Sequence, residues 1–112
     1  MSEPLRHTRE VRAVLGHGRA AQGKHAMLRS LARDDEHPAR WTVSANRRVG
    51  SAVTRNRAKR RLRAALRETV LPRGHDLVVI ARPSAVSCRF DELVGDVGAL
   101  VRRGRHSAET RS

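Results

Sequence analysis

The residues with the clearest chemical capacity are the basic ones in the middle of the chain. Seven lie between Arg55 and Arg67, no acid interrupts them before Glu68, and Arg47 and Arg48 stand just upstream. Like charges repeated at i,i+4 destabilise a helix by roughly several tenths of a kcal/mol each, so a merely solvated helix normally mixes both signs. Arginine also fits phosphate with two parallel hydrogen bonds. The segment therefore predicts contact with an external polyanion, ahead of the alternative of a solubilising charged face.

The composition of the whole chain agrees with a polyanionic partner. In 112 residues, 24 Lys and Arg face 11 Asp and Glu, which gives a formal charge of +13. Such an excess usually marks a nucleic-acid-binding protein, with an acidic membrane surface as the second possibility. Trp41 and Phe90 are the two aromatic residues, so base stacking on aromatic platforms is largely unavailable. Arginine geometry and electrostatics are expected to supply most of the binding.

Side chains suited to catalysis are scattered and form no recognisable site. No histidine pairs with another ligand at metal-binding spacing, and no serine has the context of a nucleophile elbow. Cys88 precedes Arg89, which could lower its pKa, although inert packing is the commoner role of a lone small residue. His17, in a Gly-flanked loop, could equally touch RNA or be solvated. We therefore expect no catalytic residue and no protein-bound metal. The six histidines are His7, His17, His25, His37, His75 and His106.

The first half of the chain predicts one helix and two strands. A helix is expected from Thr8, as its N-cap, until Gly16 and Gly18, with a loop to about Lys24. The short apolar stretch 26–31 predicts a strand, with a helix as the alternative. A second strand is expected at 41–45, with Trp41, Val43 and Ala45 on one face and Thr42 and Ser44 on the other. The polar stretch 34–38 between them predicts a hairpin loop. Its three adjacent acids favour a solvated turn over a metal site.

The central segment predicts a long amphipathic helix. Ser51 is a candidate N-cap, and Pro72 with Gly74 closes the helix after Leu71. About 20 residues at 1.5 Å each give a length near 30 Å. The predicted buried face comprises Ala58, Leu62, Ala65, Leu66 and Thr69. The opposite arc holds Asn56, Arg60, Arg63 and Arg67, flanked by Arg57 and Lys59.

The second half adds a strand at 77–81 and a helix at 91–103. The strand is a continuous apolar run, which is typical of a strand covered on both faces. The order is helix, two strands, helix, strand, helix, which predicts an α+β fold or an α/β sandwich with helices on a small sheet. We expect a single domain over 1–112, with an ordered core from about 5 to 103 and a frayed tail at 104–112. The chain has no apolar run long enough to span a bilayer and no apolar leader at its start, so we expect a cytoplasmic protein.

Two of the possible roles for the basic helix fail on sequence. A basic-region zipper needs apolar heptads that continue the helix, and Pro72 stops it. A helix lying on a membrane needs a bulky apolar face with Trp or Phe, whereas this face is built from Ala and Leu. Binding of RNA or DNA by a globular domain remains.

The segment from Arg47 to Arg63, RRVGSAVTRNRAKRRLR, resembles the signature of the bacterial ribonuclease P protein. In that family two basic residues, a hydrophobic-Gly turn and Ala-Val precede a helix of the pattern Arg-Asn-Arg-x-Lys-Arg-x-x-Arg. Weaker resemblance covers Arg9 to Arg19, with its Gly-His-Gly-Arg exit, and Asp76 to Pro83.

The resemblance implies a compact α+β fold, a small mixed sheet packed by helices in the order α-β-β-(β)-α-β-α. It is similar to domain two of a small-subunit ribosomal protein, with a left-handed crossover around the basic helix against the usual rule. It also implies an accessory subunit that is inactive alone, since the RNA subunit and its Mg²⁺ ions carry the chemistry. The implied partners are ribonuclease P RNA and precursor tRNA, with no membrane and no protein partner required.

The resemblance further assigns the binding residues. The surface facing the catalytic RNA would comprise Arg47, Arg48, Arg55, Asn56, Arg57, Lys59, Arg60, Arg63 and Arg67. A cleft between the first helix and the sheet would hold the single-stranded 5′ leader of precursor tRNA, with Val11, Leu15, Arg29 and Ser44 as its candidate residues. The family usually has Phe in the first helix and an aromatic residue in the first strand. The cleft here is therefore expected to use aliphatic contacts and Arg29.

Two other functions share the same charge pattern. A ribosomal or assembly protein would bind ribosomal RNA tightly and leave tRNA maturation unaffected. A DNA-binding protein would prefer duplexes and gain nothing from a single-stranded leader. All three functions predict a steep dependence of binding on salt, so salt alone cannot separate them.

Overall fold

The computed structural model describes residues 3–5 and 7–109 of the chain. In chain order the elements are β1 (Glu3–Pro4), α1 (Thr8–His17), β2 (Arg19–Gln22), β3 (Ala26–Ala32), β4 (Arg40–Ser44), the 3-10 turn η1 (Arg47–Val49), α2 (Ala52–Arg67), β5 (His75–Ala81), the 3-10 turn η2 (Pro83–Val86) and α3 (Phe90–Glu109).

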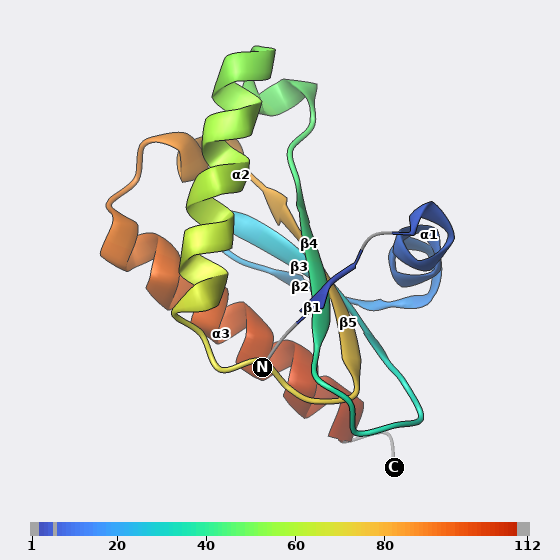
Figure 1. Ribbon diagram of the computed structural model, residues 1–112. Helices are drawn as coiled ribbons and strands as arrows, with labels where there is room; N and C mark the ends of the chain where they lie inside the picture. The colour runs from blue at the N-terminus through green and yellow to red at the C-terminus, as the bar shows by residue number, and fades with distance from the viewer. Residues whose placement is uncertain (1–2, 6, 110–112) are drawn as a thin grey trace.

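A mixed sheet divides the molecule into two unequal layers of helices. Its strand order is β1-β4-β5-β3-β2; β4 is parallel to β5 and to β1, whereas β3 is antiparallel to β5 and to β2. Figure 1 shows α2 and α3 on one side of the sheet and α1 alone on the other. The α+β fold with a small mixed sheet packed by helices, predicted from sequence, is therefore confirmed.

The strand order corrects two expectations about the first half of the chain. The segment 34–38 is not a hairpin loop, because β3 and β4 are separated by β5. The strand β5 takes the centre since its residues 76–79 are buried on both faces. The expected loop up to Lys24 is instead the strand β2, which pairs with β3 from Arg19 opposite Ser30 to Gln22 opposite Met27. This edge strand is mostly exposed, so it lacks the apolar alternation that would have revealed it.

The helix ends also differ from the expected ones. The helix α1 starts at Thr8 and is preceded by His7, so Thr8 is its first residue and not its cap. Ser51 does cap α2, as predicted, but the helix ends at Arg67, and Thr69 lies beyond it with its hydroxyl donating to the Ala65 carbonyl at 2.8 Å.

The last helix is longer than expected. The helix α3 runs to Glu109 and not to Arg103, and residues 110–112 lie outside the described part of the chain. Gly104 is buried against β3, where an added Cβ would stand 2.9 Å from Leu28 Cδ2. Close packing of α3 on the sheet therefore continues past the predicted end of the ordered core.

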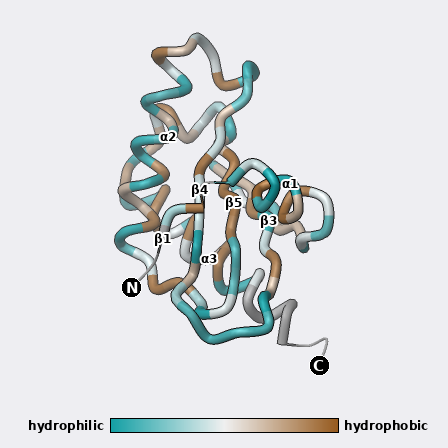
Figure 2. The backbone as a smooth tube through the Cα atoms, turned by 45° about the vertical axis from the view of Figure 1, so that its right-hand side comes forward, coloured by the Kyte–Doolittle hydropathy of each residue, from teal (hydrophilic) through white to brown (hydrophobic). Residues whose placement is uncertain are grey.

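The core consists of two apolar clusters on opposite faces of the sheet. The larger lies under α2 and α3 and includes Leu28, Leu62 and Leu77 among its fully buried side chains. The smaller lies under α1 and comprises Leu5, Val14 and Val78, with Val11, Leu31 and Ile80 partly buried against it. Figure 2 shows the apolar stretch of β5 as a brown band in the middle of the molecule and α2 alternating between teal and brown. Both clusters share β5, whose side chains point alternately to each.

Candidate nucleic-acid interface

A short capped turn sets the start of the basic helix. The Asn46 side chain accepts a hydrogen bond from the Arg48 backbone N–H at 3.0 Å, which begins η1 directly after β4. Gly50 follows with a φ of 138°, a conformation that L side chains rarely adopt. The Ser51 hydroxyl then accepts from the Thr54 N–H at 3.3 Å and caps α2. The turn leaves Arg47 and Arg48 exposed beside the first turn of the helix.

The helix α2 separates an apolar face from a basic one, as its sequence predicts. Ala58, Leu62, Ala65 and Leu66 are buried in the large cluster. Among the predicted RNA-binding residues of the helix, Asn56, Arg57, Arg60 and Arg67 are exposed, whereas Arg55, Lys59 and Arg63 are half-buried.

The predicted binding residues of α2 have no acidic partner among the described residues. None of the ion pairs found there involves a basic side chain of this helix. A shallow hollow lined by Val53, Asn56, Arg60 and Arg63 lies on the helix surface. Because their positive charge is not neutralised within the described part of the protein, these residues can take phosphate groups of a nucleic acid.

Arg61 is the exception within the basic run. Its guanidinium donates to the Ala85 carbonyl at 2.7 Å and to the Cys88 carbonyl, so it ties α2 to η2 and the segment that follows. Arg61 belongs to the basic run of the sequence but is not one of the predicted binding residues. Its position on the helix side that faces η2 gives it a structural role.

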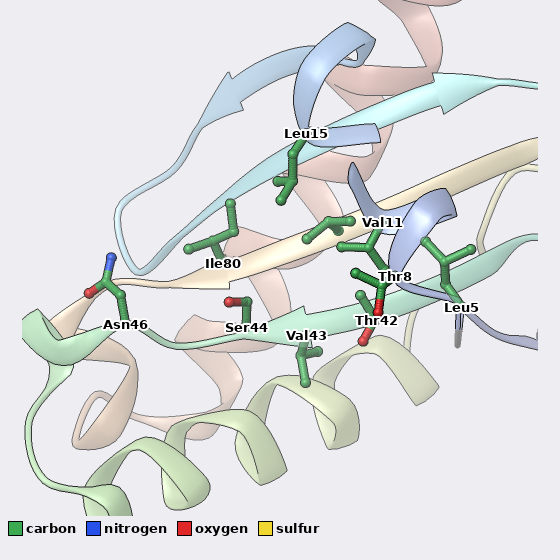
Figure 3. A pocket seen from close by; sticks show the side chains of 10 residues that line it. Leu5, Thr8, Val11, Leu15, Thr42, Val43, Ser44, Asn46 and Ile80 are labelled. Carbon is green, nitrogen blue, oxygen red and sulfur yellow. The ribbon is translucent and has the colours of Figure 1, made fainter. Parts of the chain in front are cut away.

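A second candidate site is a cleft of about 470 Å³ between α1 and the sheet. Figure 3 shows Val11 and Leu15 from α1 above it and Ser44 and Ile80 from the strands below. Three of the four predicted cleft residues, Val11, Leu15 and Ser44, line it. The complete lining is Leu5, Thr8, Val11, Leu15, Thr42, Val43, Ser44, Asn46, Val78 and Ile80.

The fourth predicted cleft residue, Arg29, lies outside the lining. Its guanidinium donates to the Leu15 carbonyl at the end of α1, so it holds a wall of the cleft from outside. The lining therefore contains no charged side chain and no aromatic ring. Thr8, Thr42, Ser44 and Asn46 supply polar atoms that can hydrogen-bond to a ligand, and the aliphatic residues supply a flat apolar surface.

Sequence reasoning missed several of the lining residues. The alternation of β4 could have found Thr42, because it placed Thr42 and Ser44 together on the face opposite Trp41. The period-2 pattern of β5 could likewise have found Val78 and Ile80. Leu5 had no signal, because the two-residue strand β1 is fixed by pairing with β4, where the Leu5 N–H donates to the Trp41 carbonyl at 2.8 Å.

An ion-pair network surrounds the buried carboxylate of Asp76 and reaches α1. The Asp76 carboxylate, 6% exposed, accepts from Arg40 Nε at 2.9 Å and from Arg40 Nη2 at 2.7 Å, and it also pairs with Arg33. Arg40 reaches in addition to Glu10 of α1. The hydrogen bonds that Arg40 donates to Asp76, which have the largest effect, and to Glu10 raise the pKa of Arg40 above its usual value. Both arginines are therefore held as fixed cations that join three strands and α1.

The neighbouring loop contributes one further pair. Arg33 donates hydrogen bonds to Asp35 and to Asp76, and these bonds raise the pKa of Arg33, the one to Asp35 most strongly. The bond between Arg33 and Asp35 also lowers the pKa of the Asp35 carboxyl. Asp35 also accepts from the His37 N–H at 3.0 Å, which closes the turn of 34–38. Of the three acids in this loop, Asp35 is therefore bound within the protein.

The structure brings together few of the other reactive side chains. In the described residues no three of His, Cys, Asp and Glu cluster so as to hold a metal ion. Buried His25 contacts the Ser84 hydroxyl through Nδ1 at 2.8 Å and lies 3.5 Å from Glu92 through Nε2. Cys88 is half-buried beside Arg61. None of the helices in the described part of the chain has the length and apolar character needed to cross a membrane.

Comparison with known proteins gives consistent similarities. Residues 1–105 match the family model described as Ribonuclease P. A ribonuclease P protein component from Gluconacetobacter diazotrophicus is 39% identical over 102 residues, which cover 88% of each chain. One from Symbiobacterium thermophilum is 40% identical over 94 residues and 81% of each chain. Among solved structures, the RNase P protein from Thermotoga maritima superposes with a TM-score of 0.77 at 25% identity, covering 90% of this chain and 96% of that one.

Proposed function

The chain belongs to the ribonuclease P protein family, and we propose that it is the protein subunit of a ribonuclease P, with no catalytic residue of its own. In this role it binds the catalytic RNA subunit and the 5′ leader of precursor tRNA. It thereby assists the endonucleolytic cut that gives the mature 5′ end of tRNA. Alone, the protein is inactive, and it works in the cytoplasm with no protein partner required.

The observation that carries this proposal is the unpaired basic face of α2. Its arginines and lysine have no acidic partner among the described residues, although ion pairs occur elsewhere in the same structure. Arg47 and Arg48 extend the positive surface beyond the helix start. We assign this face to the phosphates of the catalytic RNA, whose charge it offsets.

The cleft between α1 and the sheet is assigned to the leader. It lies on the opposite face of the sheet from α2, so the two RNAs can be bound at once. A neutral, aliphatic lining suits the faces of unstacked bases, and the hydroxyl and amide groups of β4 suit base edges and ribose hydroxyls. Leader contacts would position the substrate without adding charge repulsion.

The proposal leaves the chemistry to RNA-bound Mg²⁺. The described residues offer no cluster of ligands for the ion, so we assign its binding to the catalytic RNA and the substrate. By offsetting phosphate repulsion, the protein would allow weakly bound ions to suffice.

The test is cleavage of a precursor tRNA with a 5′ leader by a bacterial ribonuclease P RNA at low Mg²⁺, with and without the protein. We expect cleavage at the mature 5′ end only when both are present, and none with the protein alone. A double variant with Arg60→Ala and Arg63→Ala should restore the cleavage rate only at a higher concentration than the unmodified protein. If the protein does not restore cleavage yet binds ribosomal RNA tightly, it is a structural RNA-binding protein. A preference for duplex DNA would instead make it a DNA-binding protein.

A further inference from the structure

We propose that two arginine contacts hold α1 at its two ends and thereby set the width of the cleft, so that Glu10, Arg40 and Arg29 are positioning residues for the leader. The first contact is the Glu10–Arg40 ion pair, and the second is the hydrogen bond from Arg29 to the Leu15 carbonyl. The inference rests on the proposed function, because it assigns a role to residues around the leader cleft.

Few apolar contacts hold α1 on the sheet, although the chain enters β2 one residue after the helix ends. The helix is ten residues long, its N-cap residue His7 makes no capping bond through its side chain, and Val14 is its one fully buried side chain. Helices of this length are marginal in water without tertiary contacts. The small cluster beneath it has three buried residues, one of them contributed by α1 itself. The apolar hold on α1 therefore consists of Val14 and a few partly buried side chains, among them Val11.

The contact near the start of α1 is anchored in the sheet. Arg40 is bound through two of its nitrogens by Asp76, which is buried on the central strand β5. The guanidinium therefore cannot follow α1 if the helix moves. Glu10, in the first turn of the helix, reaches this fixed cation through its carboxylate. The pair ties the first turn of α1 to the strand β4, which lies between β1 and β5.

The contact at the end of α1 acts on a wall of the cleft. The Leu15 carbonyl is one of the last four of the helix, which have no partner within it. Arg29, on β3, donates to this oxygen, and a cation there is also favoured by the helix dipole. The Leu15 side chain lines the cleft. The bond therefore fixes the backbone of a residue that the leader would touch.

The two contacts come from opposite sides of the cleft floor. The strands β3 and β4 flank β5, whose Val78 and Ile80 form part of that floor. In the register of the sheet, Arg29 and Thr42 both lie opposite Val78, and Arg40 lies opposite Asp76 two residues away. The helix is thus held across β5, at one end from β4 and at the other from β3. Loss of either contact would let that end move and change the opening.

The experiment measures affinity of the holoenzyme, assembled with a bacterial ribonuclease P RNA, for two precursor tRNAs. One carries a ten-nucleotide 5′ leader and the other a leader of one nucleotide. The test variants are Glu10→Gln and Arg29→Met. The matched controls are Asp34→Asn, an exposed carboxylate in the loop after β3, and Arg12→Met, an exposed arginine on α1; neither side chain makes a hydrogen bond or ion pair among the described residues.

The sign of the Glu10→Gln effect separates positioning from electrostatics. Removing a negative charge should by itself strengthen binding of a polyanion, as we expect for Asp34→Asn. Positioning predicts the opposite: about fivefold weaker binding of the long-leader substrate, or about 1 kcal/mol at 1.4 kcal/mol per factor of ten. Arg29→Met should weaken the same binding about fivefold more than Arg12→Met. For both test variants, the affinities for the substrate with a one-nucleotide leader and for the catalytic RNA should match those of the controls. In both, the backbone amides of α1 should exchange their hydrogens with solvent faster than in the controls.

Two results would overturn the inference. The first is a holoenzyme with Glu10→Gln that binds the long-leader substrate as tightly as the holoenzyme with Asp34→Asn. The second is a holoenzyme with Arg29→Met whose affinities for both substrates equal those of the holoenzyme with Arg12→Met. A failure of the leader function itself is visible in the unmodified protein, which would then bind both substrates equally. In that case the positioning role falls together with the function on which it rests.

Discussion

The two faces of the sheet are built by different means. In the part of the chain that the structure describes, sixteen buried residues form one apolar cluster under α2 and α3, and three form another under α1. The α1 face compensates with charge: the network of Arg33, Asp76, Arg40 and Glu10 and the bond from Arg29 lie on that side. A large apolar core supports a face over its whole area, whereas directional contacts fix a helix at a few points.

This difference matches the two proposed tasks. A structured RNA presents phosphates at fixed positions, and the basic face of α2 stands on the rigid side of the sheet. A single-stranded leader varies in sequence, and the cleft that would receive it is on the side held by fewer contacts.

The largest effect should come from the centre of the large cluster. Leu62 is fully buried on α2, so Leu62→Ala should lower the free energy of unfolding by about 2–5 kcal/mol. Urea denaturation followed by circular dichroism measures this loss as a shift of the midpoint at constant slope. A loss below about 1 kcal/mol would show that α2 can relax into the space, and the large face would then not be the rigid one.

Two neighbouring arginines of α2 should separate stability from binding. Arg61→Met removes hydrogen bonds to the Ala85 and Cys88 carbonyls and should cost about 1–3 kcal/mol of unfolding free energy. Arg60→Met, on the exposed arc, should change stability by less than about 0.5 kcal/mol. It should instead weaken binding to the catalytic RNA and reduce the log–log salt slope by about 0.7–0.9 if one phosphate contact is lost. Unfolding and RNA binding are measured for both variants. A loss of stability in Arg60→Met together with a loss of RNA binding in Arg61→Met would contradict the roles given to the two arginines.

Adjacent valines of β5 compare the two faces directly. Val79 belongs to the large cluster and Val78 to the small one, and each is 1% exposed. Val79→Ala should cost about 2 kcal/mol, and Val78→Ala about 1 kcal/mol less, because α1 can settle into the space. Val78→Ala should also change affinity for a long-leader precursor, since Val78 lines the cleft. Equal losses of stability and unchanged leader affinity would remove the contrast between the faces.

The smallest effect concerns the loop beside the network. Arg33 lowers the pKa of Asp35 below 3.8, so the carboxylate stabilises the fold above that pH and the contribution is lost as pH falls through the lowered pKa. Asp35→Asn should therefore lower the melting temperature slightly at pH 7, and the difference from the unmodified protein should shrink as the pH falls through the lowered pKa of Asp35. Melting curves at pH 7 and at a series of pH values below 3.8 test this. A difference that persists at low pH would mean that the charge of Asp35 is not what stabilises the loop.

The sequence predicts the large face well because its signals are local. Helical periodicity places Leu62 and Leu66 on one side of α2, and Ser51 marks its start, as the structure confirms. The apolar run of β5 likewise identifies a strand covered on both faces. These patterns depend on residues within a few positions of one another, which a single sequence displays directly.

The small face could not be predicted to the same extent, because it depends on distant pairings. The strands β3 and β4 are consecutive in the chain, yet β5 lies between them in the sheet, and no pattern of neighbouring residues indicates this order. Arg29 was predicted as a cleft contact from a family resemblance, but its partner is a backbone carbonyl 14 positions away. Asp76 and Arg40 lie 36 positions apart and meet only through strand register. Contacts of this kind follow from the fold and not from residue type or spacing.

The central claim is that the two faces bind two different RNAs, and one pair of measurements on two variants tests it most directly. One variant carries both Arg60→Ala and Arg63→Ala on α2. The other carries Ser44→Asp, which adds a charge to an exposed position of the cleft. For each variant we measure the affinity for ribonuclease P RNA alone and the gain in holoenzyme affinity that a long leader gives. We predict that the α2 variant loses affinity for the catalytic RNA and keeps the leader gain. The cleft variant should keep the first affinity and lose the gain. If both variants change the same quantity, the assignment of separate faces is contradicted.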